Sequence, residues 1–416
     1  MTTWAGAGNI PPMASVARAL IARGHVVEVL ADELVRPDFE VVGASFTPWR
    51  RIEHRTAHGR DGDIPRDWEP NSPGEQITRL RDHVTAGPAP AHAADTAEEI
   101  ERLQPDVLLC EQLLLGPLVA AEASGTPVVV LNPTVDVVPA PGRPPFGFGL
   151  MPANTPEAHE RDRQLAAAAT EMWDAALSAI NQAREEHGLV PLEHTMDQGR
   201  IASRVLVMTS AAFDFPGEVP PVVRYVGPRL DDAVWAAQQP WQAAGDGPLV
   251  LVSLSSDYQE QLDVLKRITA ALGDLPVRAL ITTGQGVEPS TIDAPANVTV
   301  MAAAPHSEVL QEAALCVTHC GHGTTLKALA AGVPLVCIPM GRDQFDVAAR
   351  VEYAGAGLTV DAQAEPAGIA DAVREVLREP RYLIRAQELA AAIAEETATD
   401  HVVHEIEALV TDPLLA

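Results

Sequence analysis

The stretch 317–346, VTHCGHGTTLKALAAGVPLVCIPMGRDQFD, restricts the possible folds of this chain more than any other part of it. It opens with a small, glycine-rich loop. Apolar residues then recur at helical spacing, and Thr324 or Thr325 is the predicted N-cap of that helix. Gly332 ends the helix, and the apolar run 333–338 predicts a buried strand. Loop, helix and strand in this order favour an α/β fold.

The start of this predicted helix is a candidate anion site. Free backbone N–H groups and the helix dipole favour negative charge there, and glycines let a ligand approach closely. His319 and His322 would add hydrogen-bond donors for a diphosphate. The residues alone leave open an ordinary strand–helix–strand crossover with a glycine turn. The predicted diphosphate ligands are His319, Gly321, His322, Gly323 and Thr324.

Three segments of this stretch carry a family resemblance. H-C-G-x-G-T at 319–324, A-A-G-V-P-L at 330–335 and D-Q at 343–344 occur in one order and spacing. Together they resemble the donor-site signature of family 1 glycosyltransferases, which use nucleotide sugars. The resemblance implies the GT-B fold, with two facing Rossmann-like domains and the donor in the C-terminal one. It also implies that Asp343 and Gln344 hold the donor sugar.

Composition limits the size, partners and compartment of the protein. A chain of 416 residues favours two domains, and 47% hydrophobic residues allow a large core. The net charge of −28 argues against nucleic acid and anionic membranes as partners. No secretory signal or apolar run of about 18 residues is present, so we expect a cytoplasmic protein. The cysteines are expected to be reduced: Cys110, Cys316, Cys320 and Cys337.

The predicted organisation has four parts. An acceptor-binding Rossmann-like domain (1–218) ends with the strand 205–208, and a linker (219–247) precedes the donor-binding domain (248–390). A C-terminal helix (391–416) is expected to return to the first domain, as the resemblance implies. The first strand is nearly missing because the sequence starts inside it; a late start site or a lost edge of the fold would each explain this.

The loop that contains Gly6 and Gly8 resembles only the start of a dinucleotide-binding motif. Gly6-x-Gly8 would begin a dinucleotide fingerprint, but the sixth position is Pro11 where a third glycine is needed. We therefore expect neither a nicotinamide nor a flavin cofactor. In the resembling family the residue after the second glycine is usually the catalytic His. Here it is Asn9, which cannot act as a general base.

Two carboxylates are candidates to replace that base. Glu111 follows the predicted strand 107–109, at the position where the family carries a supporting carboxylate. It takes the acceptor proton in one hypothesis, with Asn9 orienting it, and merely hydrogen-bonds Asn9 in the other. Asp136, after the predicted strand 127–131, is the second candidate. An acceptor acidic enough to need little help is a third possibility.

Two segments are candidates for acceptor recognition. The polar region 50–88 contains His54 and His58, but no third ligand follows at useful spacing, so we expect no metal site. The proline-rich run 139–145 leads to Phe146 and cannot form a regular helix or central strand. It is either a roof over the acceptor cleft or a plain surface connection.

Nucleoside recognition is assigned to the ends of two predicted strands. Ser255 follows the strand 248–254, and Ala304 and His306 follow the strand 297–301. The family often carries an aromatic residue where Ala303 stands. The sequence therefore shows no stacking platform at that position, and recognition of the base by backbone groups is left open.

These features predict an inverting, metal-independent glycosyltransferase. The resemblance is to bacterial enzymes of natural-product biosynthesis. It implies a (deoxy)hexose donor linked to dTDP, or to UDP as the second choice, and a hydrophobic polyketide or aromatic acceptor. A homodimer is left open. The alternatives are a catalytically impaired relative that serves as a binding or auxiliary protein, and a GT-B epimerase of sugar nucleotides.

Overall fold

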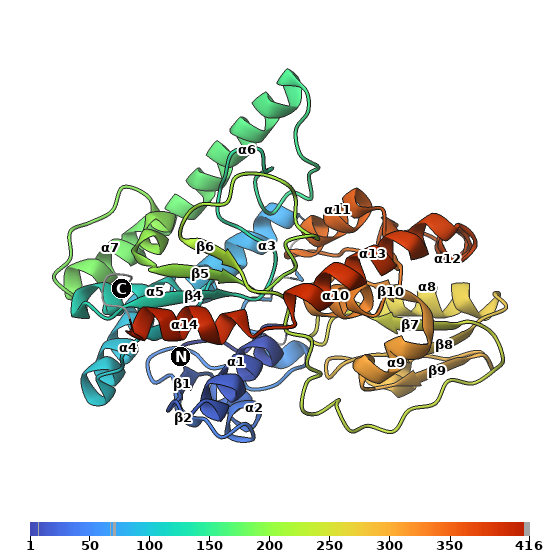
Figure 1. Cartoon of the computed structure of the whole chain (residues 1–416), viewed down its shortest axis with the longest axis horizontal. Coiled ribbons are helices and arrows are strands. Elements are labelled where there is room, and N and C mark those ends of the chain that lie inside the picture. Colours follow the sequence, from blue (N-terminus) through green and yellow to red (C-terminus); the bar gives the residue numbers. More distant parts are fainter. Residues whose placement is uncertain (7, 67, 70–71, 412–416) are drawn as a thin grey trace.

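The computed structural model describes residues 1–6, 8–66, 68–69 and 72–411. Residues 412–416 of the predicted final helix lie outside this range. The chain forms two halves, each built on parallel strands with helices on both faces, and the halves face each other across a cleft (Figure 1). This arrangement confirms the predicted GT-B type of fold.

The structure describes six strands in the first half. A four-stranded parallel sheet has the order β3-β4-β5-β6, and β1 pairs with β2. Strand β4 shows why these segments are strands: its run VVVLN is buried throughout, as a sheet covered on both faces requires. The strands are β1 (Glu28–Ala31), β2 (Ser45–Pro48), β3 (Leu108–Glu111), β4 (Val128–Asn132), β5 (Arg204–Val207) and β6 (Val223–Tyr225).

The first residues join these two groups of strands. Thr2 bridges to Leu30 in β1 and to Cys110 in β3. Its N–H donates to the carbonyl of Leu109 at 2.8 Å, and its carbonyl accepts from Glu111 N–H at 3.0 Å. The short first strand is therefore internal to the sheet. The segment is thus paired on both sides, with β1 and with β3.

Helices cover both faces of this sheet. Helix α1 buries the predicted apolar face, including Met13, Val16 and Leu20, against one side. Helices α4, α5 and α7 pack on the other side. The helices are α1 (Ile10–Ala22), α2 (Arg36–Glu40), α3 (Pro73–Leu80), α4 (Ala89–Leu103), α5 (Leu115–Ser124), α6 (Pro156–Asp174) and α7 (Leu177–Glu186).

Strand β6 corrects the prediction that 205–208 is the last strand of this half. Val223 pairs with Val205, and Tyr225 pairs with Val207. This three-residue strand lies inside the predicted linker, between prolines that suggested a loop. It forms because β5 offers it a free edge, which local sequence does not reveal. The domain boundaries themselves stay predictions.

The second half has six parallel strands in the order β12-β11-β10-β7-β8-β9. The chain leaves β7 toward β8 and β9 and then returns to β10 on the other side of β7. The strand order therefore reverses between β7 and β10, which is where open α/β sheets bind ligands. The strands are β7 (Leu249–Ser253), β8 (Arg278–Thr282), β9 (Val298–Met301), β10 (Ala313–Thr318), β11 (Leu335–Cys337) and β12 (Gly357–Thr359).

Helix starts in this half differ from the predicted ones. Helix α10 begins at His322 with Gly321 as N-cap, so Thr324 and Thr325 lie inside the helix and the predicted N-cap is wrong. Gly321 is extended, and β10 delivers the chain directly into the helix. The helices are α8 (Leu262–Gly273), α9 (His306–Glu312), α10 (His322–Ala330), α11 (Gln344–Ala354), α12 (Pro366–Arg378), α13 (Pro380–Glu396) and α14 (His401–Thr411).

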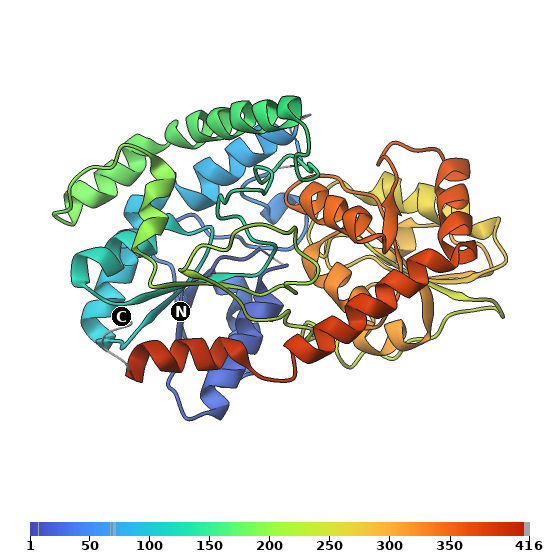
Figure 2. The same ribbon diagram turned by 45° about the horizontal axis from the view of Figure 1, so that its top comes forward.

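The end of the described chain crosses from the second half back to the first (Figures 1 and 2). Helix α13 lies along the second half, and α14 packs on α1. Val402, Val403, Ile406 and Leu409 are buried in the core that α1 also enters. Within the described residues α14 therefore packs on the first half, and it is separate from α13, whereas one helix over 391–416 was predicted.

Candidate active site

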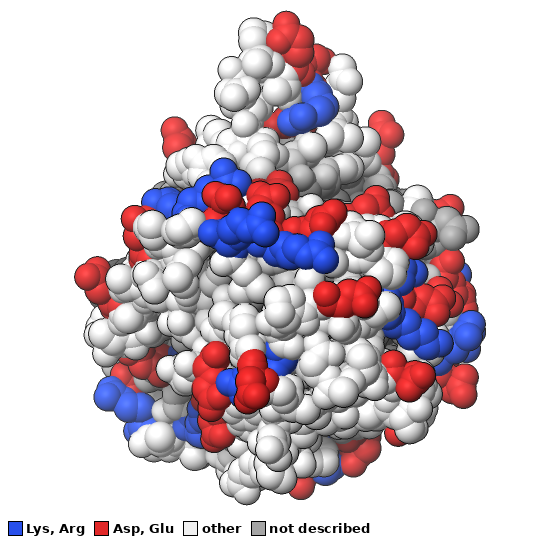
Figure 3. Space-filling model, turned by 90° about the vertical axis from the view of Figure 1, so that its right-hand side faces the viewer, with Lys and Arg blue, Asp and Glu red and all other residues white. Residues whose placement is uncertain are grey.

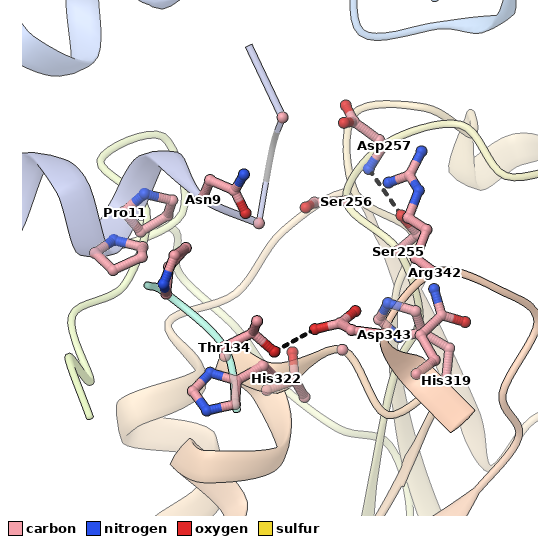
Figure 4. A pocket seen from close by; sticks show the side chains of 18 of the residues that line it. Asn9, Pro11, Thr134, Ser255, Ser256, Asp257, His319, His322, Arg342 and Asp343 are labelled. Carbon is pink, nitrogen blue, oxygen red and sulfur yellow. Dashed lines mark hydrogen bonds between the residues drawn. The ribbon is translucent and has the colours of Figure 1, made fainter. Parts of the chain in front are cut away.

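One cavity of about 520 Å³ lies between the two halves. The carboxyl ends of both sheets open into it, because each sheet reverses its strand order there. In the first half the reversal lies between the segment 1–3 and β3, which brings the loop after Thr3 beside Glu111. Figure 4 shows Asn9, Pro11 and Thr134 on one side of the cavity and Asp257, His319 and Asp343 on the other.

The N-terminus of α10 borders this cavity. The first N–H groups of a helix have no carbonyl partner within it, so those of His322, Gly323 and Thr324 are available to a ligand. A Cβ on Gly323 would meet no protein atom within 4 Å, whereas one on Gly321 would lie 2.5 Å from the His319 ring. A side chain at position 321 would therefore clash with the His319 ring, so this position requires glycine. The absence of a side chain at Gly323 leaves space for a ligand at the helix N-terminus.

The two histidines of this loop are neutral. Burial lowers the pKa of His319 to about 3, and the nearby Arg342 charge acts in the same direction. Burial also lowers the pKa of His322 to about 3. His322 Nε2 lies 2.8 Å from the Thr209 hydroxyl of the first half. His319 can donate a hydrogen bond to an anion, whereas His322 is held across the cleft through its side chain.

The two predicted sugar ligands both line the cavity but differ in their partners. Asp343 accepts a 2.5 Å hydrogen bond from the Thr134 hydroxyl across the cleft (Figure 4). Gln344 is 2% exposed, and its Oε1 accepts from the Met340 N–H at 2.8 Å. Its Nε2 donates to Gln259 Oε1 at 2.9 Å. Gln344 therefore fixes the loop that presents Asp343.

The predicted nucleoside contacts lie at the ends of β7 and β9. Ser255 Oγ accepts from the Asp257 N–H at 3.2 Å. His306 Nε2 lies 3.0 Å from the Thr282 hydroxyl, and burial lowers the pKa of His306 to about 4. Ala304 is buried, and all three predicted contacts line the cavity.

Asn9 and Glu111 meet on the first-half side of the cavity. Asn9 Nδ2 donates to Glu111 Oε1 at 3.4 Å, and the Leu113 N–H donates to Glu111 Oε2 at 3.0 Å. Glu111 is 1% exposed, and this burial raises its pKa to about 8. A carboxylate with such a pKa can exchange a proton near neutral pH. The geometry fits both hypotheses for Glu111.

Asp136 does not share this position. It does not line the cavity, and it is ion-paired with Arg143. Its Oδ1 also accepts from the Val138 N–H at 3.0 Å. These contacts hold the proline-rich loop, so the structure gives no support to Asp136 as a catalytic base.

The acceptor end of the cavity is apolar. Helices α3 and α6 contribute Ile77, Leu80, Met172 and Trp173 to its lining. Phe146 and Phe148 also line it, and the Gly147 N–H donates to Asp346 Oδ2 at 3.0 Å. The residues that directly follow the proline-rich run therefore border the cleft, whereas the run 139–145 itself does not line the cavity.

A buried ion pair across the cleft was not predicted. Arg55 Nη1 donates to Asp257 Oδ2 at 2.6 Å, and the two side chains are 4% and 1% exposed. Arg55 also donates to the Ala5 carbonyl at 2.8 Å. Burial opposes ionisation of Asp257, but His58 and Arg55 hold its pKa at about 2. The sequence showed the polar run around Arg55, yet nothing local in it identified the partner.

The two histidines considered as metal ligands face different carboxylates. His54 Nδ1 lies 3.8 Å from Asp32, and His58 Nδ1 lies 3.7 Å from Asp257. Within the described part of the chain, no group of three or more His, Cys, Asp or Glu side chains is arranged to hold a metal ion.

Comparison with known proteins identifies the family. A family model described as UDP-glucoronosyl and UDP-glucosyl transferase matches residues 162–395, more than half of the chain. The chain belongs to this family. It is therefore a glycosyltransferase, and the resemblance found in its donor-loop sequence is confirmed.

Relatives of this glycosyltransferase span its full length. The 4'-demethylrebeccamycin synthase of Lentzea aerocolonigenes is 29% identical over 423 residues, which cover 99% of each chain. The oleandomycin glycosyltransferase of Streptomyces antibioticus is 28% identical over 415 residues, or 98% of this chain and 90% of that protein.

Solved structures show the same fold. The glycotransferase of kitacinnamycin aligns with a TM-score of 0.75 at 22% identity, covering 98% of this chain and 97% of that one. Glycosyltransferase VinC in complex with DTDP aligns with a TM-score of 0.67 at 20% identity, covering 99% and 98%.

The outer surface of the donor half carries mixed charge. In Figure 3 basic side chains lie among acidic ones over this face. No helix among the described residues is long and apolar enough to cross a membrane.

Proposed function

We propose that this glycosyltransferase moves a (deoxy)hexose from a dTDP-linked sugar donor to a hydrophobic natural product of the polyketide or aromatic class. The observation that carries the proposal is the cavity that is lined both by the α10 N-terminus and by apolar side chains of α3 and α6. The α10 N-terminus suits a nucleoside diphosphate, and the apolar side chains of α3 and α6 suit a flat or hydrophobic acceptor. Relatives named for rebeccamycin and oleandomycin chemistry, and a neighbour holding DTDP, support this choice.

The diphosphate is assigned to the α10 N-terminus. The N–H groups of His322, Gly323 and Thr324, together with the neutral His319 ring, stabilise the departing charge as the sugar–phosphate bond breaks. These groups make the proposed transfer independent of a metal ion. Asp343 is assigned to the sugar hydroxyls. On donor binding these hydroxyls replace the Thr134 hydroxyl as hydrogen-bond donors to its carboxylate.

The acceptor is assigned to the cavity end near Glu111. Glu111 removes the proton of the attacking hydroxyl or N–H, and Asn9 orients its carboxylate. The new bond to the anomeric carbon forms as the bond to the diphosphate breaks, and dTDP leaves with the electron pair. The acceptor attacks the anomeric carbon from the side of the first half, and dTDP leaves on the opposite side, toward the second half. The proposed reaction therefore inverts the anomeric configuration.

Two measurements test this function. Calorimetric titration with dTDP, UDP and NAD should show saturable binding of dTDP, weaker binding of UDP and none of NAD, with His319→Ala reducing the dTDP affinity. Turnover with a dTDP-sugar and a panel of aromatic acceptors should persist in EDTA and yield the inverted anomer by NMR. Binding of NAD alone, or of no nucleotide, would contradict the proposal.

Asn9, in place of the usual histidine, favours a second candidate, an impaired relative that binds the nucleotide without turnover. That candidate predicts dTDP binding with no product from any acceptor. Release of an isomerised sugar nucleotide without acceptor would instead indicate an epimerase.

A further inference from the structure

A tryptophan of the interdomain linker lines the nucleotide end of the cavity. Trp235 is half-buried, and it borders the cavity together with Ala302, Ala303 and Ala304 at the end of β9. Among the described residues, the donor half itself contributes no Trp, Tyr or Phe to the cavity lining. The aromatic rings from the first half lie on other elements: Trp4, Phe146, Phe148 and Trp173.

The linker is tied to this corner of the donor half. Asp232 Oδ1 accepts from Lys327 Nζ in α10 at 2.7 Å. Its Oδ2 accepts from the Ser307 hydroxyl at 2.6 Å and from the Ser307 N–H at 3.1 Å. Ser307 directly follows His306. Three residues of chain span at most about 10 Å, so Trp235 stays close to these anchors.

A tight turn fixes the backbone around Trp235. The Ala236 and Ala237 N–H groups both donate to the Ala233 carbonyl, at 2.9 and 3.0 Å. The neighbouring Trp241 packs against the donor-half core, whereas Trp235 faces the cavity. The three residues Ala302–Ala304, which also line the cavity, carry only small side chains.

We infer that Trp235 is the stacking platform for the nucleobase of the donor. This inference rests on the proposed function and deepens it, because it assigns the base to a residue outside the donor half. An indole face binds any pyrimidine by stacking, and loss of such a contact weakens binding by about tenfold to a hundredfold. The linker then contributes to donor recognition as well as connecting the halves.

The test uses the full chain and two probes, dTDP and inorganic pyrophosphate, followed by calorimetry. Trp235→Ala should weaken dTDP binding by about tenfold or more, and Trp235→Phe should weaken it much less. Pyrophosphate affinity should stay unchanged in both. Val234→Ala is the matched control, because Val234 is 48% exposed and does not line the cavity; its dTDP affinity should equal that of the wild type.

A second readout guards against misfolding of Trp235→Ala. Titrating dTDP into the wild type should quench tryptophan fluorescence, and Trp235→Phe should remove that quenching. Unchanged dTDP affinity in Trp235→Ala, or equal losses for dTDP and pyrophosphate, would overturn the inference alone. Failure of the wild type to bind either dTDP or UDP would overturn the proposed function and this inference with it.

Discussion

Glu111 is the residue whose ionisation controls the proposed chemistry. Replacement by Gln keeps the shape and removes the base, so Glu111→Gln should lower kcat by about a hundredfold or more. Its dTDP affinity should stay unchanged, because the side-chain hydrogen bonds of Glu111 run to Asn9 and Leu113 of the first half and not to the α10 loop. Asn9→Ala is the companion variant and should retain part of the activity. Wild-type turnover by Glu111→Gln would show that Glu111 only orders the loop.

The pH dependence of the enzyme follows from the same pKa. Glu111 must be ionised to accept a proton, and its pKa is about 8. We expect kcat/KM to rise with pH and to level off above about pH 8. A profile that is flat between pH 6 and 9 would fit an acceptor that ionises without help.

Stability should follow pH in the opposite direction. Burial raises the pKa of Glu111 from 4.5 to about 8. The contribution of the protonated side chain to the free energy of unfolding is therefore fully present below pH 4.5 and is lost as the pH rises through 8. Glu111→Gln removes the buried charge. At pH 8 the free energy of unfolding of Glu111→Gln should therefore exceed that of the wild type by on the order of a few kcal/mol. At pH 4.5 this excess should be absent. Denaturant titrations at both pH values measure this difference.

At the scale of elements, helix α10 combines two glycines with different roles. Gly323→Ala adds a methyl group where no protein atom lies within 4 Å. In a helix interior, Ala is more stabilising than Gly by about 1 kcal/mol. In this first turn of α10 the gain in stability should be no larger than that. The variant should melt no lower than the wild type yet bind dTDP more weakly.

Gly321→Ala is the matched comparison. Its new Cβ would lie 2.5 Å from the His319 ring, so this variant should lose thermal stability as well as dTDP binding. Equal dTDP affinity in Gly323→Ala and the wild type would place the diphosphate elsewhere.

Elements with a long periodic pattern were predictable from the sequence, and short ones were not. Helix α1 and the buried strand β4 follow local apolar patterns, and both are confirmed. Strand β6 depends on pairing with β5, and the start of α10 depends on how β10 delivers the chain into the helix. The pairing of Asn9 with Glu111 was predictable from the family resemblance, which places a supporting carboxylate at position 111. Trp235 appeared only as one residue of a polar linker.

At the scale of the whole molecule, buried polar contacts hold the two halves together. Removing one partner of the Arg55–Asp257 ion pair leaves the other charge buried, which typically costs about 3–5 kcal/mol. Arg55→Met should lower the free energy of unfolding by this order. The double variant Arg55→Met/Asp257→Leu should recover part of the loss.

Acid should weaken the same contact. The pKa of Asp257 is held at about 2, below its ordinary 3.8, so the stabilisation is present above pH 3.8 and is lost as pH falls through 2. Denaturant titration of the wild type and the double variant between pH 2 and 6 checks the sign. A double variant no more stable than Arg55→Met would show that Arg55 acts mainly through its other contacts, such as the Ala5 carbonyl.

The crossing of the chain end from one half to the other has a practical consequence for recombining family members. Helix α14 belongs by sequence to the end of the donor half, yet its apolar side completes the core around α1. Glu407 in α14 accepts from Arg23 at 2.7 Å and lies 3.0 Å from His25. A hybrid enzyme with one breakpoint in the linker therefore pairs α1 with a foreign helix. A second breakpoint between α13 and α14 would let each parent supply one intact core.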